Sequence, residues 1–249
     1  MSAGDRLAFV TGTSSGIGAA VARLLLEAGW TVVGFSRRSP PETHERFRHI
    51  ALDLGDLYAL KTRAEAAITP IAREGHWSRI GLVNNAAGTG TMTPLADADP
   101  EAFAGLLALN VVAPVFLMSL VVRAAPASTP IRIVNVSTGA AMQPFPGIGE
   151  YGSSKAALRL ASMTFAAEMA SDDRPGGPRH DVAVLSYQPG IVDTPMQVTA
   201  RAPRPHNRMF VEFHAKRLLV PPAAPAREIV DFLDSAHPES FSELRYGVR

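Results

Sequence analysis

The sequence predicts a single α/β domain, a doubly wound parallel sheet with helices on both of its faces. Short apolar runs rich in β-branched residues alternate along the chain with longer segments of helical spacing. These runs are apolar throughout, a pattern typical of strands that are buried on both faces. The chain has 249 residues, of which 47% are hydrophobic and 19% charged, enough apolar material for one large core. We therefore expect one domain over residues 1–249.

About seven strands are expected, each a short apolar run next to a turn or a helical pattern. They are predicted at residues 7–10, 31–36, 49–54, 79–86, 131–137, 181–187 and 244–248. Helices are predicted at residues 16–28, 56–71, 100–122, 151–171 and 224–234. The first helix follows a glycine-rich turn, Asp56 lies where the second would be capped, and the third is expected to bend near Pro114. The stretch 190–222 follows a strand, lacks a clear periodicity and is rich in Pro, Arg and His, so it is predicted to be a substrate lid loop.

Composition excludes several functions. The formal net charge of +1 leaves no basic stripe for a phosphate backbone, so nucleic acid is not expected as a partner. The absence of cysteine excludes disulfides, thiolate catalysis and Cys-ligated zinc, and it favours the cytoplasm. His180, His206 and His214 lack metal-ligand spacing, so no metal is expected.

No membrane attachment is expected from the sequence. The N-terminal stretch MSAGDRLAFVTG has no basic region followed by a long apolar run, so we expect no signal peptide. The most apolar stretch, 106–122, is interrupted by Asn110, Pro114 and Ser119 and is expected to fall short of a membrane span. A buried core helix or a subunit interface is the preferred interpretation.

A glycine-rich turn, TGTSSGIG at residues 11–18, leaves the first strand and enters the first helix. Gly12, Gly16 and Gly18 allow a tight turn, and the helix N-terminus offers free N–H groups to a pyrophosphate. The G-x-x-x-G-x-G spacing differs from the common dinucleotide fingerprint, and a merely structural turn remains the alternative.

The second strand ends in Ser36, Arg37 and Arg38. An acidic residue at this place commonly binds the ribose hydroxyls of NAD, and none is present here. Guanidinium groups suit a 2′-phosphate, which favours NADP(H) over NAD(H). The alternative is that the arginines lie on a solvated loop.

Five motifs together resemble the short-chain dehydrogenase/reductase family over nearly the whole chain. In order they are TGTSSGIG at 11–18, NNAA at 84–87, Asn110 in ALNVVAP, YGSSK at 151–155 and PGIVDT at 189–194. The stretches QPFPGIGEY and PGIVDTPMQ are most similar to the family's sepiapterin reductases and benzil-type diketone reductases. The resemblance implies a single Rossmann-fold domain, with NAD(P) across the carboxyl ends of the strands.

The resemblance also implies roles for individual residues. Those expected around the cofactor are Gly12, Ser14, Ser15, Gly16, Ile17, Gly18, Ser36, Arg37, Arg38, Asp53, Leu54, Asn84, Ala86, Tyr151, Lys155, Pro189, Gly190, Val192 and Thr194. Ala87 replaces the glycine usual in NNAG, and Gly88 follows it. Relatives of this kind imply a homodimer or homotetramer, formed here through the helices at 106–122 and 151–170.

Tyr151 and Lys155 are four residues apart in a predicted helix, so both project from one face. A nearby ammonium favours phenolate, so Lys155 is expected to lower the pKa of Tyr151 and also to reach the nicotinamide ribose. Tyr151 would then act as general acid in reduction and as general base in oxidation. The resemblance implies that Asn110 holds a water beside Lys155. By themselves, the tyrosine and lysine would be read as an ordinary amphipathic pair.

Two adjacent hydroxyls precede this pair. In the family the substrate-orienting serine lies thirteen residues before the tyrosine, which selects Thr138, while Ser137 remains the alternative if the register is shifted. Strand alternation predicts that the two side chains point to opposite faces. Phe145, Ile148, Gln188 and Met196 are expected to face the substrate if the lid covers the cofactor.

These residues predict an NADPH-preferring carbonyl reductase or alcohol dehydrogenase, which transfers hydride between nicotinamide and a small to medium ketone or diketone. The alternative is a nucleotide-sensing binding protein on the same fold, without turnover. Substituted catalytic residues would favour that alternative, but Asn110, Tyr151 and Lys155 are all present.

Overall fold

The computed structural model describes residues 5–248 except 75, 174, 175, 178, 180, 205 and 237. One sheet of seven parallel strands has the order β3-β2-β1-β4-β5-β6-β7. The strands are β1 (Arg6–Thr11), β2 (Thr31–Ser36), β3 (Phe47–Ala51), β4 (Arg79–Asn84), β5 (Ile131–Val136), β6 (Val182–Gln188) and β7 (Phe241–Arg245). The predicted doubly wound sheet is confirmed. The strand order reverses between β1 and β4, and ligands bind at such a switch point in open α/β sheets.

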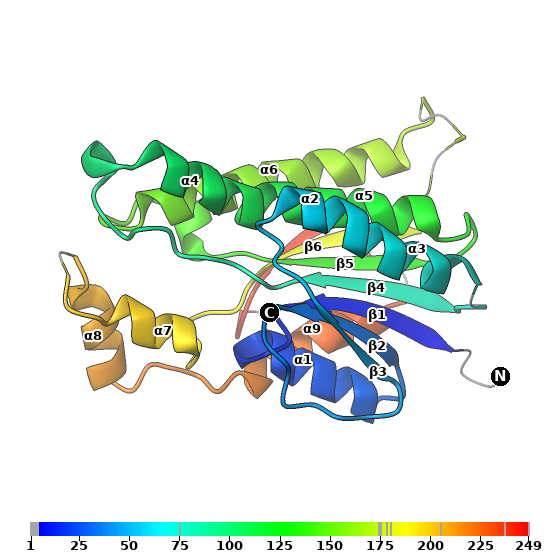
Figure 1. Cartoon of the computed structure of the whole chain (residues 1–249), viewed down its shortest axis with the longest axis horizontal. Coiled ribbons are helices and arrows are strands. Elements are labelled where there is room, and N and C mark those ends of the chain that lie inside the picture. The colour runs from blue at the N-terminus through cyan, green and yellow to red at the C-terminus, as the bar shows by residue number, and fades with distance from the viewer. Residues whose placement is uncertain are drawn as a thin grey trace.

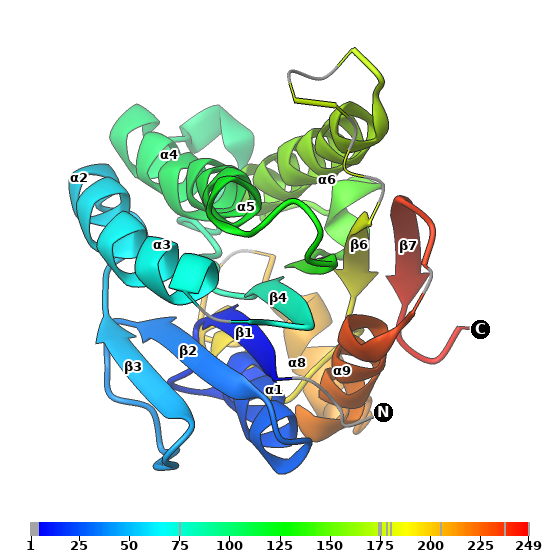
Figure 2. The same ribbon diagram turned by 90° about the vertical axis from the view of Figure 1, so that its right-hand side faces the viewer.

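Helices cover both faces of the sheet (Figures 1 and 2). One face carries α2 (Leu57–Ala59), α3 (Glu65–Glu74), α4 (Pro100–Leu107), α5 (Ala113–Ala124) and α6 (Gly149–Ala170), and the other carries α1 (Gly16–Glu27) and α9 (Ala223–Asp234). Successive residues of β1 enter opposite apolar cores: Leu7 and Phe9 face the first layer, Ala8 and Val10 the second. A strand buried on both faces must be apolar at every position, which is the pattern that predicted the sheet.

Two of the predicted helices contain a wider π turn. Residues Leu60–Ala64 connect α2 to α3, and residues Ala108–Val112 connect α4 to α5. Pro114 has no backbone N–H, so the carbonyl of Asn110, four residues earlier, cannot receive its usual helical hydrogen bond. An extra residue in the turn accommodates this loss, so the predicted irregularity near Pro114 takes the form of a π turn before it.

The helical run Pro100–Ala124 is long and apolar enough to cross a membrane, by length and composition alone. The prediction that this stretch falls short of a span is therefore wrong, because the helix continues through Asn110 as a π turn and through Pro114 in the first turn of α5. Half of its apolar window is buried inside the protein. Leu117, Met118 and Leu120 belong to the core against the sheet, as expected of a buried core helix.

The stretch 190–222, which we call the lid segment, lies beyond the carboxyl ends of the strands (Figure 1). It contains two helices that the sequence pattern did not predict, α7 (Pro195–Ala200) and α8 (Arg208–Ala215). Both are short, with six residues in α7 and eight in α8, so neither gives the long periodic pattern from which a helix is usually predicted. The two ends of the segment are joined where the N–H of Asp193 donates to the carbonyl of Val220 at 2.9 Å, and that of Val220 to Ile191 at 2.8 Å.

Candidate functional site

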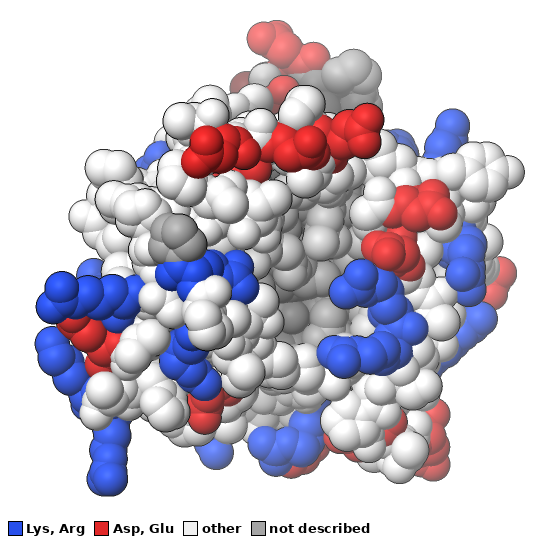
Figure 3. Space-filling model, turned by 60° about the vertical axis from the view of Figure 1, so that its left-hand side comes forward, with Lys and Arg blue, Asp and Glu red and all other residues white. Residues whose placement is uncertain are grey.

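A cavity of about 620 Å³ lies at the carboxyl ends of the strands, between the sheet and the lid segment. Figure 3 faces this end of the molecule and shows a hollow with Lys and Arg side chains on both sides of it. The loops after β1, β2, β4, β5 and β6 all contribute to its lining. The predicted cofactor and substrate residues can therefore be located against one continuous cavity.

The glycine loop forms one end of the cavity. Gly12 and Gly16 have φ of +76° and +58°, a region that side-chain-bearing residues rarely adopt. A Cβ at position 12 would lie 2.6 Å from the Asn85 amide, so the loop needs glycine for space as well. The N-cap of α1, Ser15, makes no side-chain hydrogen bond, which leaves the first N–H groups of α1 for a ligand.

Most predicted residues of this loop line the cavity: Gly12, Ser14, Ser15, Gly16 and Ile17. Gly18 does not. A Cβ on Gly18 would lie 2.4 Å from the carbonyl oxygen of Gly12, so this glycine lets α1 pack closely against the loop.

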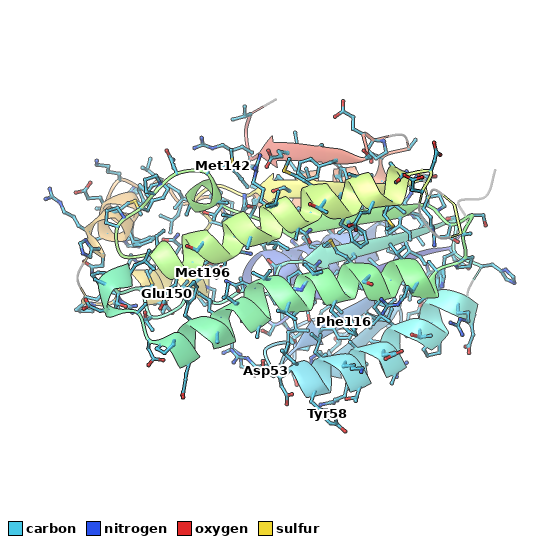
Figure 4. The ribbon with its side chains drawn as sticks, turned by 90° about the horizontal axis from the view of Figure 1, so that it is seen from above. Asp53, Tyr58, Phe116, Met142, Glu150 and Met196 are labelled. Atoms are coloured by element: carbon cyan, nitrogen blue, oxygen red, sulfur yellow. The ribbon has the colours of Figure 1, made fainter. Side chains whose placement is uncertain are left out.

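The ends of β2 and β3 meet beside the glycine loop, and Ser36, Arg37, Arg38, Asp53 and Leu54 line the cavity there. The Ser36 hydroxyl donates to the carbonyl of Arg38 at 2.7 Å and lies 3.0 Å from Nε2 of His49. The Arg37 side chain is 76% exposed, with Nη1 3.8 Å from Oδ2 of Asp53. Figure 4 shows Asp53 close to α2. Arg37 offers its positive charge to a ligand and also offsets the charge of Asp53.

At the end of β4, the residues that line the cavity differ from the predicted ones. Ala86 lines the cavity as expected, but the neighbouring residue that lines it is Asn85. Asn84 is buried, and its amide donates to Oδ1 of Asn135 at 2.8 Å. Because strand side chains alternate, Asn84 points into the helical layer while Asn85 reaches the cavity side. Asn84 therefore lies behind the wall that it was expected to form.

Tyr151 and Lys155 both line the cavity from α6. Burial raises the pKa of Tyr151 to about 12, and a hydrogen bond with the Thr138 side chain opposes this rise. Burial lowers the pKa of Lys155 to about 8. The Lys155 Nζ donates to the carbonyl of Val136 at 2.7 Å and lies 6.0 Å from the Tyr151 ring centroid. The expected lowering of the Tyr151 pKa by Lys155 is therefore not found, because desolvation of the phenol dominates.

Both candidate residues, Ser137 and Thr138, line the cavity. Here β5 ends at Val136, and Thr138 caps a short 3₁₀ turn, Gly139–Ala141. The Thr138 Oγ1 accepts from the N–H of Ala140 at 3.3 Å, and its proton remains available to Tyr151. The Ser137 hydroxyl is buried and has no hydrogen-bond partner among the described residues. The interaction with Tyr151 favours Thr138 as the hydroxyl beside the tyrosine.

Asn110 is fully buried in the π turn and lies behind the cavity wall. Its Oδ1 accepts from the N–H of Gly88 at 2.9 Å, and its Nδ2 donates to the Gly88 carbonyl at 3.0 Å and to the Ser154 hydroxyl at 2.9 Å. The side-chain amide thus anchors the loop after β4 to α6. Pro114 deprives the backbone carbonyl of Asn110 of its usual helical donor.

The far end of the cavity is apolar and aromatic. The predicted residues Phe145, Ile148, Gln188 and Met196 line it, and so do Pro189, Gly190, Val192 and Thr194 on the cofactor side. The sequence analysis did not identify further lining residues: Met92, Met209, Phe210, Phe213 and Arg245. The three in α8 could have been found from their i, i+1, i+4 spacing, whereas nothing in the sequence marked Met92 or Arg245.

Among the described residues, no three His, Asp or Glu side chains gather as they would around a metal ion. His206 lies against Gly147, and His214 is in the last turn of α8. His180 lies outside the described residues.

Comparison with known proteins assigns the fold and the cavity to a family. The sequence profile described as short chain dehydrogenase matches residues 6–205. The chain belongs to the short-chain dehydrogenase family. It is therefore an NAD(P)-dependent oxidoreductase, and the resemblance inferred from the five motifs is confirmed.

Relatives of this short-chain dehydrogenase carry the two names that its motifs suggested. A benzil reductase ((S)-benzoin forming) of Bacillus cereus is 30% identical over 242 residues, which cover 92% of this chain and 94% of the relative. A sepiapterin reductase of Xenopus tropicalis is 29% identical over 256 residues, covering 93% and 92%. The solved structure of a short-chain dehydrogenase/reductase from Saccharomyces cerevisiae has a TM-score of 0.81 at 26% identity, over 98% of this chain and 97% of that one.

Proposed function

We propose that this short-chain dehydrogenase is an NADPH-preferring carbonyl reductase, which transfers hydride between nicotinamide and a small to medium ketone or diketone. The observation that carries the proposal is the meeting of Thr138, Tyr151 and Lys155 at one wall of a cavity whose far end is apolar and aromatic. A proton donor, a carbonyl-orienting hydroxyl and a cation are the groups that carbonyl reduction requires. The same site would oxidise the alcohol in the reverse direction.

The residues present fit a dinucleotide cofactor. Gly12 and Gly16 leave room for a pyrophosphate at the N-terminus of α1, where the N–H groups are uncapped. Arg37, Arg38 and Asp53 line the same cavity. The two arginines would hold a 2′-phosphate of the adenosine ribose, and Asp53 would contact the adenine. Nη1 of Arg37 lies 3.8 Å from Oδ2 of Asp53, which partly offsets the arginine charge. The residues at the end of β2, Ser36 to Arg38, include no carboxylate that would repel a 2′-phosphate. These features support NADPH as the preferred cofactor.

When bound, the nicotinamide supplies the hydride for reduction. Tyr151 keeps its proton at neutral pH because burial raises its pKa to about 12, so it is ready to protonate the developing alkoxide oxygen. The Thr138 hydroxyl, which lies beside Tyr151, would donate its proton to the substrate carbonyl and so orient the carbonyl beside the acid. The Lys155 ammonium would stabilise the tyrosinate left behind. We infer that the backbone carbonyl of Asn110 accepts a hydrogen bond from a water beside Lys155.

The substrate end supports a bulky apolar carbonyl compound. Its lining includes Met92, Phe145, Met196, Phe210 and Phe213, with Gln188 as a polar group among them. An apolar pocket with a few polar groups binds a ligand through buried area and uses the polar groups for orientation. Two relatives are named for benzil and sepiapterin, and both names fit such a pocket.

A panel of carbonyl compounds tests this function. Benzil, 2,3-butanedione, sepiapterin and a simple aryl ketone are each mixed with enzyme and NADPH, and NADPH absorbance is followed, with NADH in parallel. We expect turnover of at least one diketone. Tight NADPH binding without turnover of any carbonyl compound would contradict the proposal and favour a nucleotide sensor.

Replacing both Arg37 and Arg38 with alanine should raise KM for NADPH by about tenfold or more and change KM for NADH little, because a charge-assisted contact to phosphate is lost. Removing Arg37 also leaves Asp53 without its nearby cation, which would repel the 2′-phosphate. Arg23→Ala is the matched control, since this exposed arginine pairs with Glu27 on the surface of α1. A wild-type enzyme with a higher kcat/KM for NADH would contradict the assignment.

Lys155→Met should abolish reduction and yet stabilise the fold at pH 7. Burial lowers the Lys155 pKa from 10.5 to about 8, so the folded protein releases this proton more readily than the unfolded chain. The charged ammonium therefore destabilises the fold below pH 8, and the cost disappears between about pH 8 and 10.5. The free-energy advantage of Lys155→Met should shrink over that window by up to about 3 kcal/mol. Urea unfolding of both proteins at pH 7 and pH 10 measures the difference, and an advantage that grows with pH would contradict the assignment.

We also infer a homodimer or homotetramer. The outer face of α6 exposes Leu160 and Met163, and Val112 is exposed in the π turn that precedes α5. Contiguous apolar side chains on helix surfaces are common at subunit interfaces. Light scattering of the purified protein distinguishes these states from a monomer.

A further inference from the structure

A buried carboxylate next to Tyr151 has no part in the chemistry above. Glu150 is the second residue of α6 and is 2% exposed (Figure 4). Its Oε2 accepts hydrogen bonds from the backbone N–H and the hydroxyl of Thr91, both at 2.9 Å. Its Oε1 has no hydrogen-bond partner among the described residues. Burying a carboxylate with unused acceptor capacity is costly, and the helix N-terminus offsets only part of that cost. Thr91 donates both hydrogen bonds, so the carboxylate fixes the position of this one residue.

The loop after β4 is shaped to receive the carboxylate. Gly90 has φ of +72°, and a Cβ there would lie 2.4 Å from Oε2 of Glu150 and 3.0 Å from Cδ2 of Leu106. Any side chain at position 90 would therefore push the carboxylate away from Thr91. The hydroxyl of Thr91 also lies 2.7 Å from that of Thr93, which extends the hydrogen bonding along the loop.

The residue that follows Thr91 forms part of the substrate end of the cavity. Met92 has φ of +57°, a conformation that is unfavourable for a residue with a side chain. It is 4% exposed and packs in a small apolar cluster with Ile148 and Ala200, next to Tyr151 and Phe210. Such a conformation persists only where the surroundings hold it. The two hydrogen bonds that the preceding residue, Thr91, donates to Glu150 provide that hold.

The lid segment contacts the same residue from the other side. Arg204 lies between α7 and α8, and its Nη2 donates to the carbonyl of Thr199 at 3.1 Å. Its Nη1 lies 3.5 Å from the carbonyl oxygen of Thr91, at the outer limit of a hydrogen bond. Thr91 is thus held through its N–H and hydroxyl by Glu150 and contacted at its carbonyl by Arg204. One residue connects the helix of Tyr151 to the lid segment.

We propose that Glu150 is a positioning residue that determines substrate size and lid closure. Through Thr91 it fixes the position of Met92 at the substrate end of the cavity. It also fixes the carbonyl of Thr91, which Arg204 contacts when the lid segment covers the cavity. The inference rests on the proposed carbonyl reduction for its kinetic readout. It does not require Glu150 to touch substrate or cofactor, since Glu150 lies behind the cavity wall.

The kinetic experiment compares benzil with 2,3-butanedione. Glu150→Ala is expected to raise KM for benzil by about tenfold, because the wall that a large substrate contacts is released, with kcat for 2,3-butanedione and NADPH affinity within about threefold of wild type. Glu150→Gln keeps one acceptor oxygen for Thr91 and should retain most of the benzil affinity. Arg204→Ala should shift KM for benzil in the same direction as Glu150→Ala.

Two matched controls are available. Glu101 is the second residue of α4, as Glu150 is of α6, but it is exposed. Arg208 is a lid arginine that pairs with Glu212 on the surface. Glu101→Ala and Arg208→Ala should leave both substrates unaffected. Equal loss on both diketones together with loss of NADPH binding in Glu150→Ala would overturn the proposal, because a general structural role would have that result.

Hydrogen exchange supplies a readout that needs no substrate. Glu150→Ala should speed amide exchange in residues 88–93 and 199–204, while exchange in β5 stays as in wild type. Thr91→Val, which removes only the hydroxyl, should give a smaller change in the same residues and keeps the test open if Glu150→Ala fails to fold. Unchanged exchange in both segments would overturn the inference. If wild-type enzyme reduces no diketone but the exchange pattern is found, the proposed function fails and the positioning role stands.

Discussion

Replacing Tyr151 with phenylalanine is expected to lower kcat for NADPH-dependent diketone reduction by about 10²–10⁴-fold, the range typical of a lost general acid. The phenol is the proton donor that the cavity offers beside Thr138, and its pKa of about 12 keeps it protonated throughout the neutral range. Phenylalanine keeps the ring and its packing against the apolar cluster of Met92, Ile148 and Ala200. Stopped-flow or steady-state loss of NADPH absorbance measures the effect.

The control for this variant is Tyr58→Phe. Tyr58 is 80% exposed and points away from the body of the molecule on α2 (Figure 4), so loss of its hydroxyl should leave turnover unchanged. NADPH binding, followed by fluorescence, should survive in Tyr151→Phe because the glycine loop and the arginines are untouched. Near-full turnover by Tyr151→Phe would exclude the tyrosine as the acid.

Thr138→Val is expected to lose most activity, by about 10²–10³-fold in kcat, because a hydrogen-bond donor to the reacting oxygen disappears. Thr138→Ser keeps the donor and should retain activity within about tenfold, with the difference arising from the missing methyl group. The hydroxyl accepts from the N–H of Ala140 at 3.3 Å, and the Thr138 side chain opposes the rise of the Tyr151 pKa, so it lies beside the phenol. Steady-state kinetics on one diketone distinguishes the three proteins.

Ser137→Ala is the decisive comparison, because Ser137 also lines the cavity and its buried hydroxyl has no partner among the described residues. It should change kcat little if Thr138 is the active hydroxyl. An enzyme that tolerates valine at 138 but not alanine at 137 would reverse the assignment. The stability of Ser137→Ala should equal or exceed that of wild type, since an unsatisfied buried hydroxyl is removed.

Much of the site was predictable because it depends on local sequence. Gly12 and Gly16 adopt positive φ where the pattern indicated a phosphate-binding turn, and Tyr151 and Lys155 share one side of α6 because residues four apart do so in any helix. The order of the motifs then placed them at the carboxyl ends of parallel strands. Asn84 was misplaced by one residue, since its side-chain direction depends on where β4 ends.

Burial determines the pKa values of Tyr151 and Lys155, and the spacing of the two residues in the sequence could not predict that burial. Lys155 Nζ lies 6.0 Å from the Tyr151 ring centroid, yet desolvation raises the phenol pKa and lowers that of Lys155 itself. The balance between a neighbouring charge and lost solvation depends on how the lid segment and α6 enclose both groups. That enclosure is a property of the packed chain.

The sequence by itself determined the parallel sheet, the glycine turn and the spacing of Tyr151 and Lys155, because apolar periodicity and helical geometry are local properties. Only the tertiary structure decided that Thr91 meets Glu150, 59 residues away, and approaches Arg204, 113 residues away. No local pattern marks residues brought together by the closing of a cavity. Glu150 looks in sequence like any acidic residue in a first helical turn, and its burial beneath a loop glycine sets it apart from Glu101.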